Sequence, residues 1–178
     1  GDLLLAGRGS SGDRISLARF DSAGQVLWSR RISSVDVDPG RNRVGVTETS
    51  DGDVVITASS AALYMARFTS EGTLEWQYQL TGDGFGGTVA IAGADGAALL
   101  GGLLSGESSP DLLLAMIDAD GTPTWVRQVS AGEGMCEVAQ DAVAVGTTGA
   151  IFVAGACRVT ALLHLPLDGE LPEPGCLG

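Results

Sequence analysis

Short apolar runs of roughly five to eight residues recur along the whole chain, and clusters of Gly, Asp and Ser separate them. No segment keeps a helical spacing of apolar residues over a length that would form a stable helix. The pattern therefore predicts an all-β protein whose strands are joined by turns. The aligned runs place the expected strands in four columns, at 2–7, 53–58, 97–102 and 150–155; at 15–20, 63–68, 112–117 and 160–165; at 25–32, 73–80 and 122–129; and at 43–47, 88–92 and 139–145.

One eight-residue segment, a turn followed by a strand that carries a tryptophan, repeats through the chain. It appears at 21–28, 69–76 and 118–125, each time with Gly at the fourth position and Trp at the eighth. A fourth copy at 167–173 keeps the glycine but has Glu173 in place of the tryptophan. A fixed period of this kind is typical of repeat architectures. The repeated glycines are Gly24, Gly72, Gly121 and Gly169, at intervals of 48, 49 and 48 residues.

Four short strands in about 48 residues is the size of one β-propeller blade. We therefore predict a single β-propeller domain over 1–178, with blades at approximately 1–42, 43–87, 88–138 and 139–178. The tryptophans are expected to pack between blades, since a large apolar side chain suits that contact. The glycines supply the positive φ angle that tight turns need. The residues given these structural roles are Trp28, Trp76, Trp125, Gly24, Gly72 and Gly121.

The strand count predicts an open arc of blades from a larger propeller. Three strands precede residue 43, two complete blades follow, and three strands remain at the end, which makes fourteen. A fourth strand is not expected in the last blade, because Pro172 and Pro174 cannot donate to a ladder. Two partial blades of three strands cannot merge into one, so the arc is favoured over a closed four-bladed ring, which is the alternative. The first blade should then expose an apolar flank.

Composition and charge exclude several classes of function. The 178 residues carry a net charge of −12, with a pI of about 4.2. Such a chain lacks the clustered cations that nucleic acids and anionic membrane surfaces require. All 10 basic residues are Arg, which excludes a Lys Schiff base and a P-loop lysine. The apolar runs are far shorter than the roughly 20 residues of a membrane helix, so no membrane insertion is expected.

A catalytic constellation is not visible in the sequence. His164 is the only histidine, and it falls in the strand column that Arg19, Arg67 and Met116 occupy in the other copies. We interpret it as an ordinary strand residue rather than as part of a Ser/His/Asp site. Arg19 and Arg67 are expected to be solvated or paired at the blade edge rather than to bind a ligand.

Two short segments resemble ligand loops without the context that such loops need. The glycine-rich segment 82–87 is followed by a strand and not by a helix, so a dinucleotide-binding loop is not expected. The segment 118–121 resembles the start of a calcium loop but lacks the downstream Glu. Since the same column reads Asp-Ser-Ala-Gly in the first copy, a plain turn is favoured.

The longer loops are expected to emerge together on one face of the ring, and function often resides on such loops. They are acidic, and weak calcium association is one hypothesis for them because hard cations prefer several oxygen ligands. A solvated acidic rim that keeps the protein soluble is the other. The candidate binding residues on this face are Asp13, Asp36, Asp38, Asp83, Glu107, Asp111, Glu133 and Glu137.

The three cysteines show no C-x-x-C spacing, so a zinc or redox motif is not expected. If Val145 pairs with Ala150 across the last hairpin, Cys136 and Cys157 lie just beyond the hairpin and two positions off register. This predicts a disulfide between them, with Cys176 as the rival partner. The bridge would imply an oxidising compartment.

The glycine and tryptophan motif, with a preceding strand that ends in Ala-Arg-Phe in two copies, resembles the repeats of pyrroloquinoline-quinone-type propellers and of SBBP-type β-propellers. A quinone enzyme of this kind would need polar and basic cofactor ligands and a metal site in the central channel. Matching residues are absent from the sequence, so neither enzymatic activity nor a cofactor is expected. The chain opens inside a strand at Gly1, without an initiator Met or a signal peptide, so we expect a piece of a longer protein with further blades.

The function that the sequence predicts is a non-catalytic scaffold or binding module of a secreted or cell-surface bacterial protein. Its location would be extracellular or in the cell envelope, and its ligand a protein or a glycan. The alternative is a fragment of a quinoprotein-like or hydrolytic propeller enzyme whose catalytic residues lie outside this chain.

Overall fold

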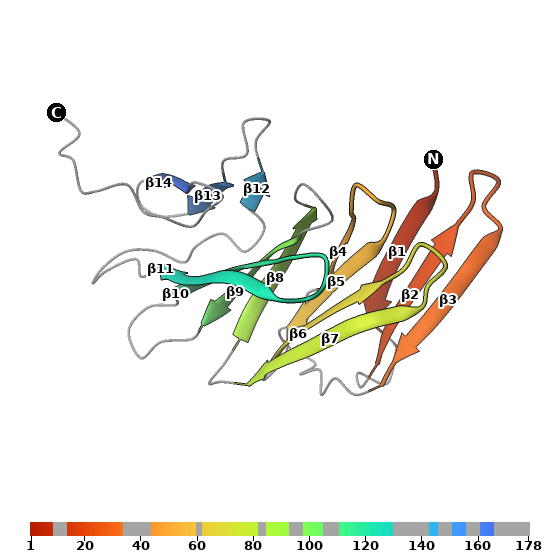
Figure 1. The fold of residues 1–178 in the computed structure, drawn as a ribbon, viewed down its shortest axis with the longest axis horizontal. Coiled ribbons are helices and arrows are strands. Elements are labelled where there is room, and N and C mark those ends of the chain that lie inside the picture. The colour runs from red at the N-terminus through yellow and green to blue at the C-terminus, as the bar shows by residue number, and fades with distance from the viewer. Residues whose placement is uncertain are drawn as a thin grey trace, which may run out of the picture.

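The computed structural model describes residues 1–8, 14–33, 44–59, 62–81, 85–92, 98–104, 111–129, 143–145, 151–155 and 161–165. These residues form fourteen strands in four antiparallel sheets, which we call blades 1 to 4 (Figure 1). Blade 1 contains β1 (Leu3–Arg8), β2 (Ile15–Phe20) and β3 (Val26–Ile32); blade 2 contains β4 (Val44–Glu48), β5 (Val54–Ser59), β6 (Ala62–Phe68) and β7 (Leu74–Thr81); blade 3 contains β8 (Phe85–Ala92), β9 (Ala98–Leu104), β10 (Asp111–Ile117) and β11 (Pro123–Val129); and blade 4 contains β12 (Val143–Val145), β13 (Ile151–Gly155) and β14 (Ala161–Leu165).

Each blade is a simple meander in which strands that follow one another in sequence pair side by side. Blades 1 to 4 hold three, four, four and three strands, which confirms the count predicted from the sequence. The first strands of blades 2, 3 and 4 lie along the inside of the row, where β4 contacts β8 and β8 contacts β12. Blades 1 and 4 lie at opposite ends of the molecule in Figure 1, so the described residues form an open arc, as expected.

Two details differ from the prediction. Strand β8 begins at Phe85 rather than at residue 88, because a bulge between Gly86 and Thr88 lets the strand continue. In the last hairpin Val145 pairs with Ile151 and not with Ala150, which is a correction of one residue. The physical reason is that the connection holds five residues, as in blade 2, where Glu48 pairs with Val54.

The one-residue correction weakens the argument for the disulfide. It moves Cys136 from two to three positions off register with Cys157, and the pairing geometry of a disulfide tolerates little displacement. Both cysteines, and Cys176, lie outside the described residues, so the bridge stays a prediction.

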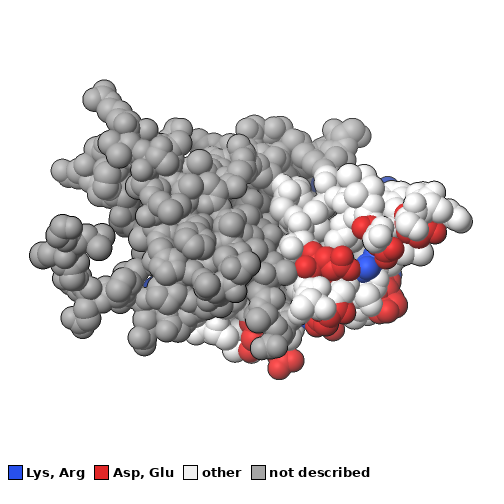
Figure 2. Space-filling view, turned by 90° about the horizontal axis from the view of Figure 1, so that it is seen from above, with Lys and Arg blue, Asp and Glu red and all other residues white. Residues whose placement is uncertain are grey.

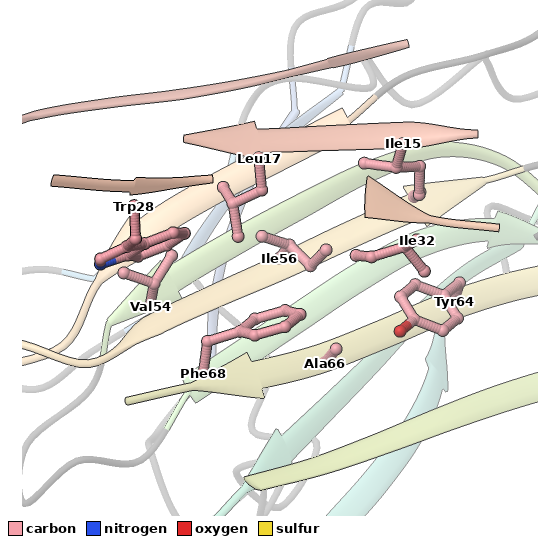
Figure 3. Packing of buried hydrophobic residues seen from close by; sticks show 10 residues of the cluster. Ile15, Leu17, Trp28, Ile32, Val54, Ile56, Tyr64, Ala66 and Phe68 are labelled. Atoms are coloured by element: carbon pink, nitrogen blue, oxygen red, sulfur yellow. The ribbon is translucent and has the colours of Figure 1, made fainter. Parts of the chain in front are cut away.

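The core lies between the blades rather than within them. Alternate residues of β5 point to opposite sides, so Val54 and Ile56 pack on blade 1 while Val55 packs on blade 3. Figure 3 shows the first of these layers, where Ile15 and Leu17 of blade 1 face the blade 2 side chains. Because blade 2 is covered on both faces, its central strands read as continuous apolar runs rather than as alternating ones.

Candidate functional site

The turns that precede the tryptophan strands are built by their first residue. In the first copy, Gly24 has a φ of +79° and donates its N–H to the carbonyl of Asp21. The Asp21 carboxylate accepts hydrogen bonds from the backbone N–H groups of Ala23 and Gln25, at 2.9 and 2.8 Å. This is a three-residue hairpin loop with a glycine bulge, stabilised by an acidic side chain that mimics a backbone acceptor.

The same turn recurs with the same glycine. Thr69 accepts through its hydroxyl in blade 2, and Asp118 accepts from Thr122 N–H at 2.7 Å in blade 3. The φ angles of Gly72 and Gly121 are +81° and +88°. Segment 118–121 is therefore a turn in which the Asp118 carboxylate accepts a hydrogen bond from the backbone. This is the interpretation that the sequence favoured.

Trp28 of blade 1 lies flat on the turn of blade 2. Its indole N–H donates to the carbonyl of Ser70 at 2.7 Å, and a Cβ on Gly72 would lie only 2.6 Å from the indole ring. Arg30 covers the ring from 5.9 Å and donates to the Gly72 carbonyl. The glycine is thus required twice, once for its φ angle and once because a side chain would displace the tryptophan.

Trp76 repeats this contact between blades 2 and 3. Its indole N–H donates to the carbonyl of Ala119 at 3.2 Å, and a Cβ on Gly121 would lie 2.8 Å from its ring. Trp125, at the same place in blade 3, is 9% exposed. The repeating motif therefore describes a joint between blades, in which the tryptophan belongs to one blade and the glycine that it needs belongs to the next.

Arg67 is the centre of an ionic cluster at the turn end of blade 2, although its side chain is only 3% exposed. Its guanidinium donates to Asp51 at 2.7 Å, to Asp53 at 2.8 Å and to Glu75 at 2.8 Å. Burial lowers the pKa of Arg67, but the hydrogen bond to Asp53 and the three negative charges outweigh burial and raise it. The pKa of Asp51 lies below its usual range, chiefly because the Thr49 hydroxyl donates to it and then because of Arg67. The cation is therefore held by three carboxylates.

Arg19 occupies the equivalent place in blade 1 and reaches into blade 2. It donates to Asp2 at 2.8 Å in its own blade, to Glu48 at 2.7 Å and to the carbonyl of Gly52 at 2.9 Å. The hydrogen bond to Asp2 is the main cause that raises the pKa of Arg19. Figure 2 shows acidic side chains gathered around a small basic patch on the described part of this end of the molecule.

Of the two expected states, solvated or paired, both arginines are paired with carboxylates. Arg67 is also buried. The carboxylates that surround them were not singled out from the sequence. The signal that identifies them is that an Asp opens the strand only in the copies that have the arginine. Asp2 and Asp53 accompany Arg19 and Arg67, whereas Ala97 and Ala150 accompany Met116 and His164. The backbone register confirms that the two arginines, Met116 and His164 occupy equivalent positions. Each pairs with the second residue after the Asp or Ala of its copy, namely Leu4, Val55, Leu99 and Phe152.

The acidic residues proposed for the long-loop face are not brought together by the described structure. Asp111 is the first residue of β10, opposite Leu104, rather than part of the preceding loop. Asp13, Asp36, Asp38, Asp83, Glu107, Glu133 and Glu137 lie outside the described residues. Among the residues that are described, no group of three or more His, Cys, Asp or Glu side chains could hold a metal ion. The described part of the chain also contains no helix that is long and apolar enough to cross a membrane.

Comparison with known proteins supports the fold. No family model and no curated protein matches the chain. A solved protein of unknown function from Bacteroides caccae is similar in structure, with a TM-score of 0.60 and 16% identity over 97% of this chain and 56% of that one. A bifunctional GH43-CE protein of Bacteroides eggerthii matches 93% of this chain and 23% of that one, with a TM-score of 0.52 and 11% identity.

A third similar structure is an engineered GH43 glycoside hydrolase with endo-xylanase and exo-arabinofuranosidase activity. Its TM-score is 0.50 and its identity 12%, over 94% of this chain and 38% of that one. The chain has the fold of β-propeller blades. It spans little more than half the length of the first of these structures and less of the others. The likeness to quinone-type and SBBP-type repeats stays a resemblance of motif.

Proposed function

We propose that the chain is a non-catalytic segment of a larger β-propeller, which acts as a scaffold or binding module of a secreted or cell-surface bacterial protein. The observation that carries this proposal is that the repeated Trp and Arg residues are engaged in contacts within the protein. Trp28 and Trp76 join blades, and Arg19 and Arg67 are paired with carboxylates. Polar groups that are already paired serve packing better than they serve chemistry on a substrate.

The binding surface in this proposal is the long-loop face. Loops held by a rigid scaffold are where propellers and similar folds place their recognition residues. Acidic loops suit a glycan, whose hydroxyl groups donate hydrogen bonds to carboxylates, or a basic protein surface. Weak calcium binding by the same carboxylates belongs to this proposal.

A hydrolytic propeller enzyme is the second candidate, because two of the similar structures are GH43 proteins and one is described as a glycoside hydrolase. Glycoside hydrolysis needs a pair of carboxylates at a defined separation across the sugar. In this candidate the pair would include acidic loop residues of this chain or residues of blades beyond it.

One experiment separates the two candidates. Xylan and arabinan oligosaccharides are added to the 178-residue protein, and binding is followed by calorimetry while sugar release is followed by a reducing-end assay. We expect heat of binding without release, and loss of the heat in the variant Asp36→Asn/Asp38→Asn. Glu71→Gln, at an exposed turn on the other end, is the matched control and should bind like the parent. Sugar release that scales with protein concentration and disappears in the loop variant would establish the enzyme instead.

A further inference from the structure

We propose that the outer face of blade 1 is a docking site for another propeller blade, and that the turn Asp21–Gln25 is the acceptor for that blade's tryptophan. The outer face consists of the residues of β1, β2 and β3 that point away from blade 2. This site rests on the proposed role as a segment of a larger propeller, but it does not depend on what the long loops bind.

The outer face of blade 1 has the same register and chemistry as a face that is buried in blade 2. Leu3 and Leu5 take the positions of Val54 and Ile56, which are completely buried against blade 1. Leu3 and Leu5 are instead 63% and 58% exposed. The matching cross-strand pairs are Leu3 with Phe20 and Leu5 with Ala18 in blade 1, and Val54 with Phe68 and Ile56 with Ala66 in blade 2.

Leu5 borders a hollow of about 530 Å³ that involves all three strands of blade 1. Its lining combines the small residues Ser16, Ala18 and Ser29 with Leu5 and with the two arginines Arg30 and Arg31. Exposed apolar surface of this kind on a sheet face indicates a protein contact. Since the face is hollowed and presents exposed Leu3 and Leu5 beside polar side chains such as Arg31, it fits a neighbouring blade that offers both apolar and polar side chains.

The turn of blade 1 is open at the point where the other two turns are covered. Gly72 and Gly121 each lie under an indole ring, but no described atom lies within 4 Å of a Cβ built on Gly24. Gly24 nevertheless has the same φ of +79° and the same turn hydrogen bond. The carbonyl of Ser22, two residues before the glycine, corresponds to the acceptors Ser70 and Ala119. Blade 1 therefore offers both a carbonyl that can accept from an indole N–H and the open space over a glycine that an indole ring needs.

A second copy of this chain has no tryptophan to offer this site. Trp28 and Trp76 already occupy the turns of the following blades, and Trp125 is buried. The fourth copy of the motif has Glu173 at the tryptophan position. The occupant is therefore a blade that carries the turn and tryptophan motif and is not part of residues 1–178.

The pairing of β1 points to the same occupant. Among the described strands, β1 pairs only with β2, whereas β5, β9 and β13 each pair on both sides. A segment that enters from the amino-terminal side would supply both the preceding blade and the missing innermost strand of blade 1. The similar protein from Bacteroides caccae, of which this chain spans 56%, has the length to hold such additional blades.

The test adds the proposed occupant to the existing protein. Residues 44–96 are fused directly before Asp2, which supplies a copy of blade 2, with its own Trp76, and a copy of β8 as the missing strand. Asp2 then takes the place of Ala97, so the connection keeps five residues as in blades 2 and 3. Alkylation of the variant Leu5→Cys is followed by peptide mass spectrometry in the fused and unfused chains. We expect the labelling rate at residue 5 to fall at least about tenfold in the fusion, because burial protects a thiol until the site opens. An equal rate in both chains would overturn the proposal.

The tryptophan contact has its own control within the fusion. Gly24→Ala should lower the melting temperature by several degrees more in the fusion than in the unfused chain, because only there does the added Cβ meet an indole. Changing Trp76 to Ala in the added copy alone should remove that difference. A difference that persists without the indole would show that Gly24 is not its acceptor, and would overturn that part of the proposal.

A second measurement needs no fusion and guards against a fusion that does not fold. In the 178-residue chain, Leu3→Thr/Leu5→Thr should leave the melting temperature within about 1 °C of the parent and reduce self-association in sedimentation. Leu17→Thr, at a position 1% exposed on the opposite face, is the matched control and should clearly lower the melting temperature. If the double variant is as unstable as the control, the face is already covered within this chain and the proposal fails. A dimer in which Leu5→Cys resists alkylation would make a second copy the occupant and would also overturn it.

Discussion

Replacing Gly72 by Ala adds the smallest side chain at a point where the structure has no room for it. The φ angle there is +81°, and the new Cβ would lie 2.6 Å from Cδ2 of Trp28. Optimal carbon contacts are about 3.5–4.0 Å, so the indole must move away. The left-handed backbone costs about 1–2 kcal/mol for a residue with a Cβ. Displacing the packed ring adds about 1–3 kcal/mol. We therefore expect Gly72→Ala to lower the free energy of unfolding by about 2–5 kcal/mol.

Gly24→Ala is the matched control in the same chain. Its φ angle is +79°, in the same turn, but no described atom lies within 4 Å of the position of its Cβ. It should therefore lose only the backbone contribution of about 1–2 kcal/mol. The difference between the two variants isolates the contact of Trp28 with the next blade, including its hydrogen bond to Ser70.

Urea unfolding of both variants and the parent measures this difference. Tryptophan fluorescence follows the transition, and an unchanged dependence on urea shows that the same cooperative unit unfolds in each case. Free energies of unfolding for the two variants that agree within about 0.5 kcal/mol would refute the reasoning, since the clash would then contribute nothing measurable.

Three further outcomes are expected. Thr57→Val should raise the free energy of unfolding by about 1 kcal/mol in a urea melt, because the Thr57 hydroxyl is buried without a hydrogen-bond partner; a loss of stability would show that the hydroxyl is satisfied. Burial raises the pKa of Tyr64 to about 12, so the unfolded chain releases this proton first and stability should fall as the pH rises from 10 to 12. Thermal melts of Tyr64→Phe should show a shallower fall in that range, and an equal fall would assign the effect elsewhere. Arg67→Met should cost about 1–3 kcal/mol, less than for a fully buried pair since its acidic partners are partly exposed, and Asp53→Ala/Arg67→Met should recover part of that loss in the same melt; a double variant less stable than the single one would contradict this.

The arc of blades was predictable because the fold depends on a feature that repeats. The glycine of the turn is needed for its backbone angle and for the approach of the tryptophan, so it returns at every joint between blades. Strand ends were less predictable, because they depend on bulges and loop geometry. The bulge at Gly86 lengthens β8, and one extra residue in the last connection shifts the pairing of Val145. Neither event changes the apolar pattern that the sequence displays.

The ionic cluster was harder to predict because it is not common to all blades. Arg67 is held by side chains from the turn before β5 and from strand β7, and only the fold brings Asp51 and Glu75 to it. The turn glycine repeats in four copies, which is enough to reveal the period. The pairing of Arg with Asp occurs in only two copies, which is too few to be recognised as a pattern. The variation nevertheless carries physical information. In the two copies that have Ala in place of the Asp, the arginine is replaced as well, by Met116 or His164. No arginine in this column is therefore left without its aspartate.

These two layers of the design have different consequences for assembly. The joint made by Trp28 and Gly72 joins any blade to the next one, because every complete copy of the motif contains both halves. The bonds from Arg19 to Glu48 and to the Gly52 carbonyl, in contrast, join blade 1 to blade 2 through a cation that blade 3 lacks, since blade 3 has Met116 at the arginine position. A general joint allows blades to be added in a row, and a pair-specific bond favours one order over another. The order of blades in the arc is therefore encoded at the turn end, where the charges are, and its continuation at the open tryptophan site of blade 1.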